Sequence, residues 1–147
     1  PELYNSKEAF DRELISIIQQ HGVELIVLAG YMRVLTPLFV SHYFGKILNI
    51  HPSLLPKFPG LNTHQRAIDA SEKVHGVSVH FVTKELDGGP LICQESVIID
   101  NLDTKETLSM KVLKKEHVIY PKVIHWYTKK RLHLIDDKTA TLDGKII

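Results

Sequence analysis

Apolar residues recur along the chain at two spacings, one typical of amphipathic helices and one typical of buried strands. The first segment carries its apolar residues at helical spacing, at Phe10, Leu14, Ile17 and Ile18. We expect this helix to begin after Ser6, a residue type that caps helices, and to stop at Gly22. Residues 25–29 are continuously apolar, which predicts a short strand buried on both faces in a parallel sheet.

The middle of the chain alternates between helix and strand signals. Thr36 and Pro37 suit the start of a short helix that reaches about His42, and residues 46–50 predict a second buried strand. Residues 51–62 contain too many prolines and glycines for a regular element, so we expect a loop there. Asn62 or Thr63 then caps a helix that ends near residue 71.

The remaining segments predict two hairpins separated by a long helix. Residues 77–82 and 91–99 predict strands joined by a turn at residues 87–90, and together an antiparallel hairpin. Asp103 and Glu106 have the spacing of a capping-box variant, at the start of a helix that Pro121 should kink or split before residue 130. A final hairpin is expected from residues 132–135 and 140–142.

This order of elements predicts a single α/β domain over residues 1–147. We expect a doubly wound, mostly parallel sheet with an antiparallel edge hairpin, because strands and helices alternate before the hairpin signals begin. Ligands of such sheets bind outside the carboxyl ends of the strands. A site is therefore expected after the strands at residues 25–29 and 46–50.

Composition and charge narrow the function classes. The chain has 18 basic and 17 acidic residues, a formal net charge of +1, and no basic block of the kind that neutralises nucleic acid. Cys93 is the only cysteine, which leaves no intrachain disulfide or thiolate cluster and fits a cytoplasmic protein. No apolar run approaches the roughly 20 residues of a membrane span. We expect small-molecule substrates, no nucleic-acid or membrane partner, and a monomer or homodimer.

Three polar residues could form a site at the strand ends. Asn49 and His51 end the second predicted strand, and its period-two alternation puts their side chains on one face. Asp87 lies in a glycine-rich turn from which a carboxylate could reach them. An amide, an imidazole and a carboxylate suit acyl transfer, in which a developing oxyanion needs donors and a proton must move. No residue carries the signals of a covalent nucleophile, and the histidines lack metal-ligand spacing.

Each of these residues also has a structural alternative. A histidine at a strand end is more often a hydrogen-bonded structural residue, and an aspartate in a glycine-rich turn usually only forms the turn. His80 and Glu116 are expected to be structural and solvated, respectively. The residues alone therefore predict a polar site and leave its chemistry open.

Three longer strings carry a family resemblance. They are residues 49–60 (NIHPSLLPKFPG), residues 78–83 (SVHFVT) and residues 85–90 (ELDGGP). In this order and combination they resemble the glycinamide ribonucleotide formyltransferases, within the folate-dependent formyltransferase family. The resemblance runs from about Tyr4 to Gly144 without an evident gap.

The resemblance implies an activity and a set of roles. It implies formyl transfer from the co-substrate 10-formyltetrahydrofolate to the amine of glycinamide ribonucleotide in purine synthesis, by direct attack with a tetrahedral intermediate and without a metal. Asn49 and a cationic His51 would stabilise the oxyanion, and Asp87 would position the water or proton relay. The folate pocket would comprise Met32, Arg33, Val34, Leu35, Val82, Thr83 and Lys84, and the ribonucleotide would contact Lys7, Lys57, Ser78 and Glu116.

Two departures from the family pattern lead to further expectations. Lys7 stands where arginine is common, and lysine lacks the planar fork that grips phosphate. Family members begin with a strand and a loop whose amides hold the substrate phosphate, and no such segment precedes Pro1. We therefore expect the N-terminal portion of the domain to be absent, and these 147 residues alone to show weak activity or none.

Three other functions remain open. Formyltetrahydrofolate hydrolase passes the formyl group to water, and methionyl-tRNA formyltransferase adds a basic domain; both share the Asn, His and Asp pattern. The near-neutral charge and the string Gly88-Gly89-Pro90 favour the ribonucleotide enzyme. A non-catalytic folate-binding domain would bind folate without turnover.

Overall fold

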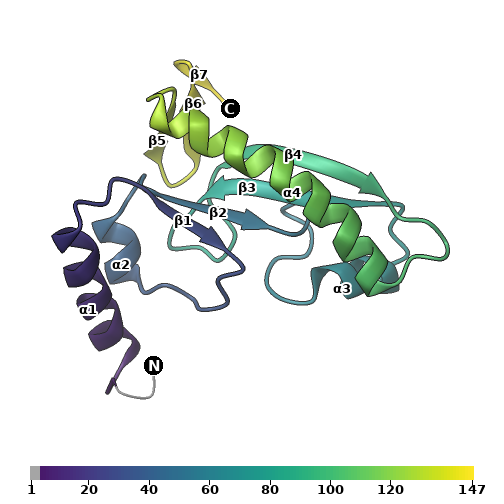
Figure 1. Ribbon diagram of the computed structural model, residues 1–147, viewed down its shortest axis with the longest axis horizontal. Coiled ribbons are helices and arrows are strands. Elements are labelled where there is room, and N and C mark those ends of the chain that lie inside the picture. Colours follow the sequence, from purple (N-terminus) through teal and green to yellow (C-terminus); the bar gives the residue numbers. More distant parts are fainter. Residues whose placement is uncertain (1–3) are drawn as a thin grey trace.

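The computed structural model describes residues 4–147, so the expectation about a segment before Pro1 lies outside the described residues. The described residues form four helices and two sheets, whose arrangement Figure 1 shows. In order they are α1 (Lys7–Gln20), β1 (Ile26–Ala29), α2 (Pro37–His42), β2 (Ile47–His51), α3 (Thr63–Asp69), β3 (Val74–Phe81), β4 (Leu91–Ile98), α4 (Lys105–Thr128), β5 (Leu132–Asp136), β6 (Thr139–Leu142) and β7 (Lys145–Ile146).

The larger sheet has four strands in the order β1-β2-β3-β4. Only β1 and β2 are parallel, and both β2–β3 and β3–β4 are antiparallel. The expected mostly parallel sheet is therefore wrong for the described strands, while the α/β class and the β3–β4 hairpin are confirmed. A parallel neighbour needs a crossover that packs on the sheet. Between β2 and β3 the chain instead makes a loop and the short α3, which packs against α4.

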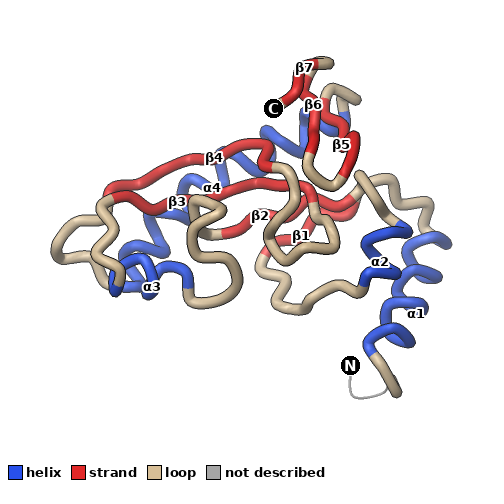
Figure 2. Tube along the Cα trace, turned by 180° about the vertical axis from the view of Figure 1, so that it is seen from behind, coloured by secondary structure: helices blue, strands red, loops and turns tan. Residues whose placement is uncertain are grey.

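Helices cover both faces of this sheet, as a doubly wound fold requires. On one face, Leu48 and Ile50 of β2 join residues of α4 such as Leu108 and Val112 in the main apolar cluster. On the other face, Ile47 packs with α1 and α2 residues in a second cluster. Figure 2 shows the same arrangement from behind, with α4 crossing the far side of the sheet.

The strand β1 is less buried than its sequence suggests. Its residues alternate between half-buried and exposed, and the Val27 side chain is 41% exposed. The expectation that β1 is buried on both faces is wrong, because β1 is an edge strand among the described residues. The same expectation is confirmed for β2, which pairs on both sides.

The helix ends agree with the expected caps in part. Ser6 caps α1 through a hydrogen bond from the Ala9 backbone N–H, as expected. The capping box of α4 uses Thr104 and Thr107, so the expected pair Asp103 and Glu106 is wrong by one residue. The helix α3 starts at the expected place, but Asn62 makes no capping hydrogen bond.

The helix α4 runs for 24 residues without interruption, so the expected split at Pro121 is wrong. Proline removes one hydrogen bond of the helix, but the burial of Ile119, Tyr120 and Val123 holds the residues on both sides of Pro121 in helical conformation against the sheet. The Tyr120 hydroxyl also donates to the carbonyl oxygens of Leu28 and Leu48, which ties α4 to β1 and β2.

The chain ends in a second, three-stranded sheet. The expected hairpin of β5 and β6 is confirmed, and β7 adds a third strand that the sequence did not predict. None of the helices within residues 4–147 is long and apolar enough to cross a membrane.

Candidate active site

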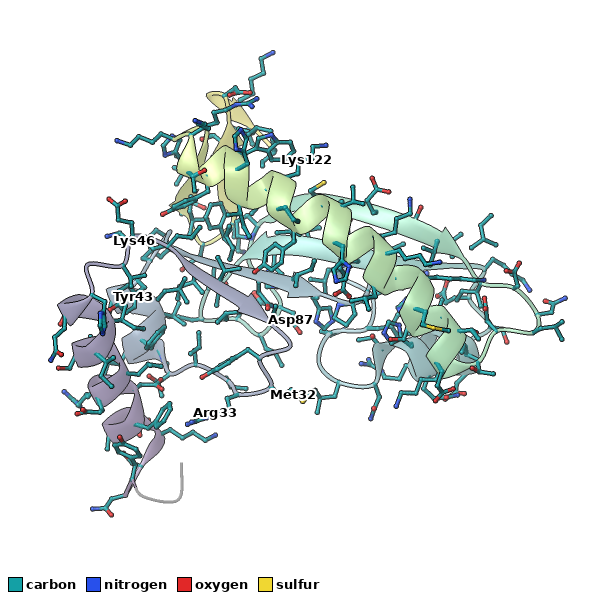
Figure 3. The ribbon with its side chains drawn as sticks, in the orientation of Figure 1. Met32, Arg33, Tyr43, Lys46, Asp87 and Lys122 are labelled. Carbon is teal, nitrogen blue, oxygen red and sulfur yellow. The ribbon has the colours of Figure 1, made fainter. Side chains whose placement is uncertain are left out.

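The three predicted catalytic residues meet at the carboxyl end of β2. Asn49 and His51 lie two residues apart on this strand, on the sheet face that also carries Ile47. Asp87 comes from the connection between β3 and β4, and its Oδ2 atom lies 3.5 Å from His51 Nδ1. Figure 3 labels Asp87 beside the ends of the strands, with Met32 and Arg33 on the neighbouring loop. The structure thus brings the amide, imidazole and carboxylate together.

A backbone carbonyl fixes the orientation of the His51 ring. His51 Nε2 lies 2.9 Å from the Phe58 carbonyl oxygen, which only accepts hydrogen bonds, so Nε2 carries a proton and donates. The other ring nitrogen, Nδ1, is the one that faces Asp87. The side chain of His51 is only 7% exposed, so protein groups surround the ring.

The turn that carries Asp87 depends on its glycines. Asp87 has a φ of 51°, in the left-handed region that Asp tolerates better than most residues. A Cβ atom on Gly89 would overlap the Phe81 carbonyl oxygen, so only glycine fits there. Asp87 Oδ2 accepts a hydrogen bond of 2.9 Å from the Gly60 backbone N–H, which ties the turn to the loop after β2.

His80 belongs to the same cluster, although the sequence favoured a structural role. Its Nδ1–H donates to the Phe81 carbonyl oxygen at 2.8 Å, which leaves Nε2 to accept from the Asn49 side-chain amide at 3.2 Å. Burial lowers the pKa of His80, so the ring is neutral near pH 7. Asn49 and His80 are opposite each other across β2 and β3. The pairing register between β2 and β3 would have identified His80 as a neighbour of Asn49. This register can be predicted only if the relative direction of the two strands is known.

Two adjoining cavities open beside these residues. The larger one has a volume of about 570 Å³ and is lined by Asn49, His51 and Asp87 together with the loop after β1 and the side of α4. The smaller one, of about 110 Å³, shares Asn49 and Asp87 with it. Apolar side chains dominate the lining of the smaller cavity; they are Leu28, Val34, Leu35, Val40, Val82 and Leu86.

All of the residues expected to bind folate line one or both cavities. Arg33 and Val34 line both, and Met32 lines the larger one with a side chain that is 80% exposed. The smaller cavity is lined by the remaining four, which are Leu35, Val82, Thr83 and Lys84. The guanidinium of Arg33 stacks 4.0 Å over the ring of Phe10, so α1 helps to hold the loop after β1.

The residues expected to bind the ribonucleotide are not brought together. Glu116 lines the larger cavity, and burial raises the pKa of its carboxyl group. Lys57 is exposed and pairs with Glu72, and Lys7 is exposed at the start of α1; neither lines a cavity. Ser78 is fully buried beneath the loop after β2, where its hydroxyl bonds to Ser53, Leu55 and Gln94.

Metal coordination has no support in the described part of the chain. Within residues 4–147 there is no group of three or more His, Cys, Asp or Glu side chains that could hold a metal ion. The chemistry that the site supports uses hydrogen-bond donors and a carboxylate.

Comparisons with known proteins identify relatives of this chain among formyltransferases. The phosphoribosylglycinamide formyltransferase of Escherichia coli is 51% identical over 97% of this chain, and that of Haemophilus influenzae is 48% identical over 98%. The solved structure of the corresponding protein from Coxiella burnetii superposes with a TM-score of 0.94 at 51% identity over 99% of this chain. A formyltetrahydrofolate deformylase from Pseudomonas syringae is more distant, with 29% identity and a TM-score of 0.82.

The chain spans 66% of the E. coli relative, 68% of the H. influenzae relative and 68% of the Coxiella chain. Residues 1–124 match the formyl transferase family, and this match includes all of β1 to β4, the loop after β2 and most of α4. The chain therefore belongs to the formyl transferase family.

Proposed function

We propose that this chain transfers the formyl group of 10-formyltetrahydrofolate to the amine of glycinamide ribonucleotide, a step of purine synthesis. The observation that carries the proposal is the convergence of Asn49, His51 and Asp87 on one cavity. The phosphoribosylglycinamide formyltransferases at 48–51% identity support this choice of acceptor.

Asn49 and His51 are suited to stabilise the charge that develops during the transfer. When an amine adds to the formyl carbon, negative charge builds on the formyl oxygen, and fixed donors in a partly enclosed cavity lower the energy of that state. The Asn49 amide is held by His80, and the His51 ring is held by the Phe58 carbonyl. The Phe58 carbonyl occupies the Nε2–H of His51, so the proton that this ring can offer to the formyl oxygen is Nδ1–H, which it carries only in its cationic form. Both groups are oriented before any substrate binds, which is the condition for a large effect on the chemical step.

Asp87 is suited to manage the proton. The attacking amine must lose a proton and the departing nitrogen of the folate must gain one. The Asp87 carboxylate lies next to His51 and lines both cavities, so it can accept the proton directly or through a water molecule. Its link to the Gly60 N–H keeps one oxygen fixed while the other remains near His80.

The smaller cavity is suited to the flat heterocycle of the folate. Apolar walls favour a ring system, and the backbone of residues 82–87 offers hydrogen-bonding groups at one side. When bound, 10-formyltetrahydrofolate supplies the electrophilic carbonyl carbon. Val34, Leu35 and Val82 would hold the ring, and Met32 and Arg33 would border it.

The larger cavity is suited to the ribonucleotide. It extends from the trio along α4 past Glu116 and Ser109. Glu116 offers a carboxyl group to the hydroxyl or amine groups of this substrate, and Lys105 adds a positive charge at the far end. Lys7 and Lys57 do not line this cavity, and Ser78 lies beneath the loop, so we leave these three out of the proposed contacts.

Consumption of 10-formyltetrahydrofolate by the purified chain tests the proposal. The assay is run with glycinamide ribonucleotide as acceptor and again with water as the only acceptor, alongside the Asp87→Asn variant. We expect consumption that requires the ribonucleotide and that the variant loses, at a low rate if residues 1–147 are assayed alone.

The other outcomes assign a different function. Equal consumption without the ribonucleotide would establish the hydrolase, the activity named for the Pseudomonas relative. Folate binding without consumption in either assay would contradict the proposed transfer by this chain and leave a binding function.

A further inference from the structure

We propose that Gln94, a residue of β4 outside both cavities, positions His51 through Ser78 and the loop after β2. The loop comprises residues 52–60 and is here called the His51 loop. The inference rests on the proposed function for its catalytic consequence, but its structural part does not depend on that activity.

The His51 loop is joined to the trio at both ends. At its start, Ser53 N–H donates to the His51 carbonyl oxygen at 2.8 Å. Near its end, the Phe58 carbonyl accepts from His51 Nε2 at 2.9 Å, and the Gly60 N–H donates to Asp87 at 2.9 Å. Any shift of the loop therefore changes which groups hold the imidazole and the carboxylate.

Ser78 is the buried anchor of this loop. Its hydroxyl donates to the Ser53 carbonyl at 2.6 Å and accepts from the Leu55 N–H at 3.0 Å. It also accepts from the Gln94 side-chain amide at 2.8 Å. A hydroxyl has one donor and two acceptor positions, so all three positions are occupied by protein groups. Ser78 lies opposite His51 in the β2–β3 ladder, so the anchor of the loop is a cross-strand neighbour of the residue that the loop orients.

Gln94 completes the anchor from the next strand. Its Nε2 atom donates both to the Ser78 hydroxyl and to the Leu55 carbonyl at 3.0 Å. The two bonds fix the hydroxyl of Ser78 in the orientation that donates to Ser53, because the proton cannot point toward another donor. The amide of Gln94 therefore influences the orientation of His51 only through the His51 loop, which makes Gln94 a positioning residue.

The consequence concerns which nitrogen of His51 carries the proton. The Phe58 carbonyl selects the form with a proton on Nε2 and turns Nδ1 toward Asp87. If the loop loosens, this carbonyl no longer holds Nε2, and the ring is free to exchange tautomers or rotate. Nδ1 would then no longer be held toward Asp87 and the reacting centre, so the cationic ring could not present its Nδ1–H there in a fixed orientation, while the apolar walls that bind the folate would be unchanged.

Gln94→Glu tests the inference with little change of shape. Glutamate has no N–H to donate, so both bonds of the Gln94 amide are lost, and the exposed position lets the fold tolerate the change. Ser96→Ala, on the same face of β4, is the matched control. Nitrogen-15 NMR of the histidine rings of the full chain reports the tautomer of His51 without any substrate.

We expect wild-type and Ser96→Ala chains to show His51 protonated on Nε2, and Gln94→Glu to show a mixed or broadened signal. In the formyl-transfer assay we expect a roughly three- to tenfold lower kcat for Gln94→Glu with both KM values within about twofold. Gln94→Leu, which also lacks the donors and adds no charge, should reproduce both effects. An unchanged His51 signal in both folded Gln94 variants would overturn the inference.

The two proposals fail in distinguishable ways. If the wild-type chain transfers no formyl group but the NMR change occurs, the proposed function fails and the positioning role stands. If the chain is active and the variants change KM instead of the His51 signal, the positioning role fails and the function stands.

Discussion

At the scale of single residues, each polar group of the site has a hydrogen-bond partner that restricts its orientation. His51 donates to a carbonyl, Asn49 donates to a neutral histidine, and Asp87 accepts from a backbone N–H. Each group is fixed by a partner that cannot exchange roles with it. Substitutions should therefore affect turnover more than binding.

Asp87→Asn should abolish most of the activity and leave the fold intact. The asparagine carbonyl can still accept from the Gly60 N–H, but it cannot take up a proton. We expect kcat to fall roughly 10²- to 10⁴-fold with little change in KM. Steady-state formyl transfer measures the loss, and urea unfolding is the control for the fold. A residual kcat within about tenfold of wild type would contradict the role of Asp87.

His80→Phe should reduce kcat by roughly tenfold at nearly constant KM, because Asn49 loses the acceptor that orients its amide. Phenylalanine keeps a flat ring and suits a buried position, since His80 is 2% exposed. Comparison of kcat and KM with wild type tests this expectation. An unchanged kcat in a folded variant would mean that the orientation of Asn49 does not depend on His80.

The sequence predicted the residues of the trio but not all of their partners. Alternation along β2 placed Asn49 and His51 on one face, and the glycine-rich turn singled out Asp87. The contact of His80 with Asn49 depends on the register between β2 and β3, which alternation within one strand does not contain. Ser78 was expected to bind substrate, yet burial under the loop depends on long-range packing.

At the scale of helices and strands, local patterns fixed where elements lie but not how they pair. The apolar runs of β1 and β2 are alike in sequence, and only their neighbours make one an edge strand and the other central. The direction of β3 depends on the path of residues 52–73. Because these residues do not cross the sheet face, β3 runs antiparallel to β2. The cap of α4 shifted by one residue because Thr104 and Thr107 satisfy each other, while Asp103 bonds to Lys111.

Gly89→Ala should destabilise the β3–β4 connection strongly. A Cβ atom at this position meets the Phe81 carbonyl oxygen, which belongs to the backbone of β3 and cannot move aside without breaking the ladder. We expect a loss of about 3 kcal/mol or more in the free energy of unfolding. Gly144→Ala is the control: its φ of 76° costs about 1 kcal/mol, and it has open space around it. Similar losses for both variants in urea unfolding would refute the steric account.

At the scale of the whole molecule, lowering the pH should destabilise the folded chain at pH values where its carboxylates are still ionised. Burial, with a smaller effect of the neighbouring His64, lowers the pKa of His75 to about 4, and burial also lowers the pKa of His64 and His80. The unfolded chain binds these protons near pH 6.5 and the folded chain only at lower pH. The stabilising contribution is therefore complete above about pH 6.5 and is lost as the pH falls toward 4.

We expect the free energy of unfolding to fall by roughly 1–2 kcal/mol between pH 7 and pH 5 for His75 alone. Urea unfolding at these two pH values measures the change. His75→Gln, which cannot titrate, should show a shallower pH dependence than wild type. Equal slopes for the two chains would exclude His75 as the source.

The order of the larger sheet has a consequence for how the chain folds. Each strand from β1 to β4 pairs with the strand that precedes or follows it in sequence. The longest of these connections is the one that contains α3, so little loop entropy opposes each pairing. The sheet can therefore grow one strand at a time in the order of synthesis, because no described strand of it has to wait for a partner from a distant part of the chain.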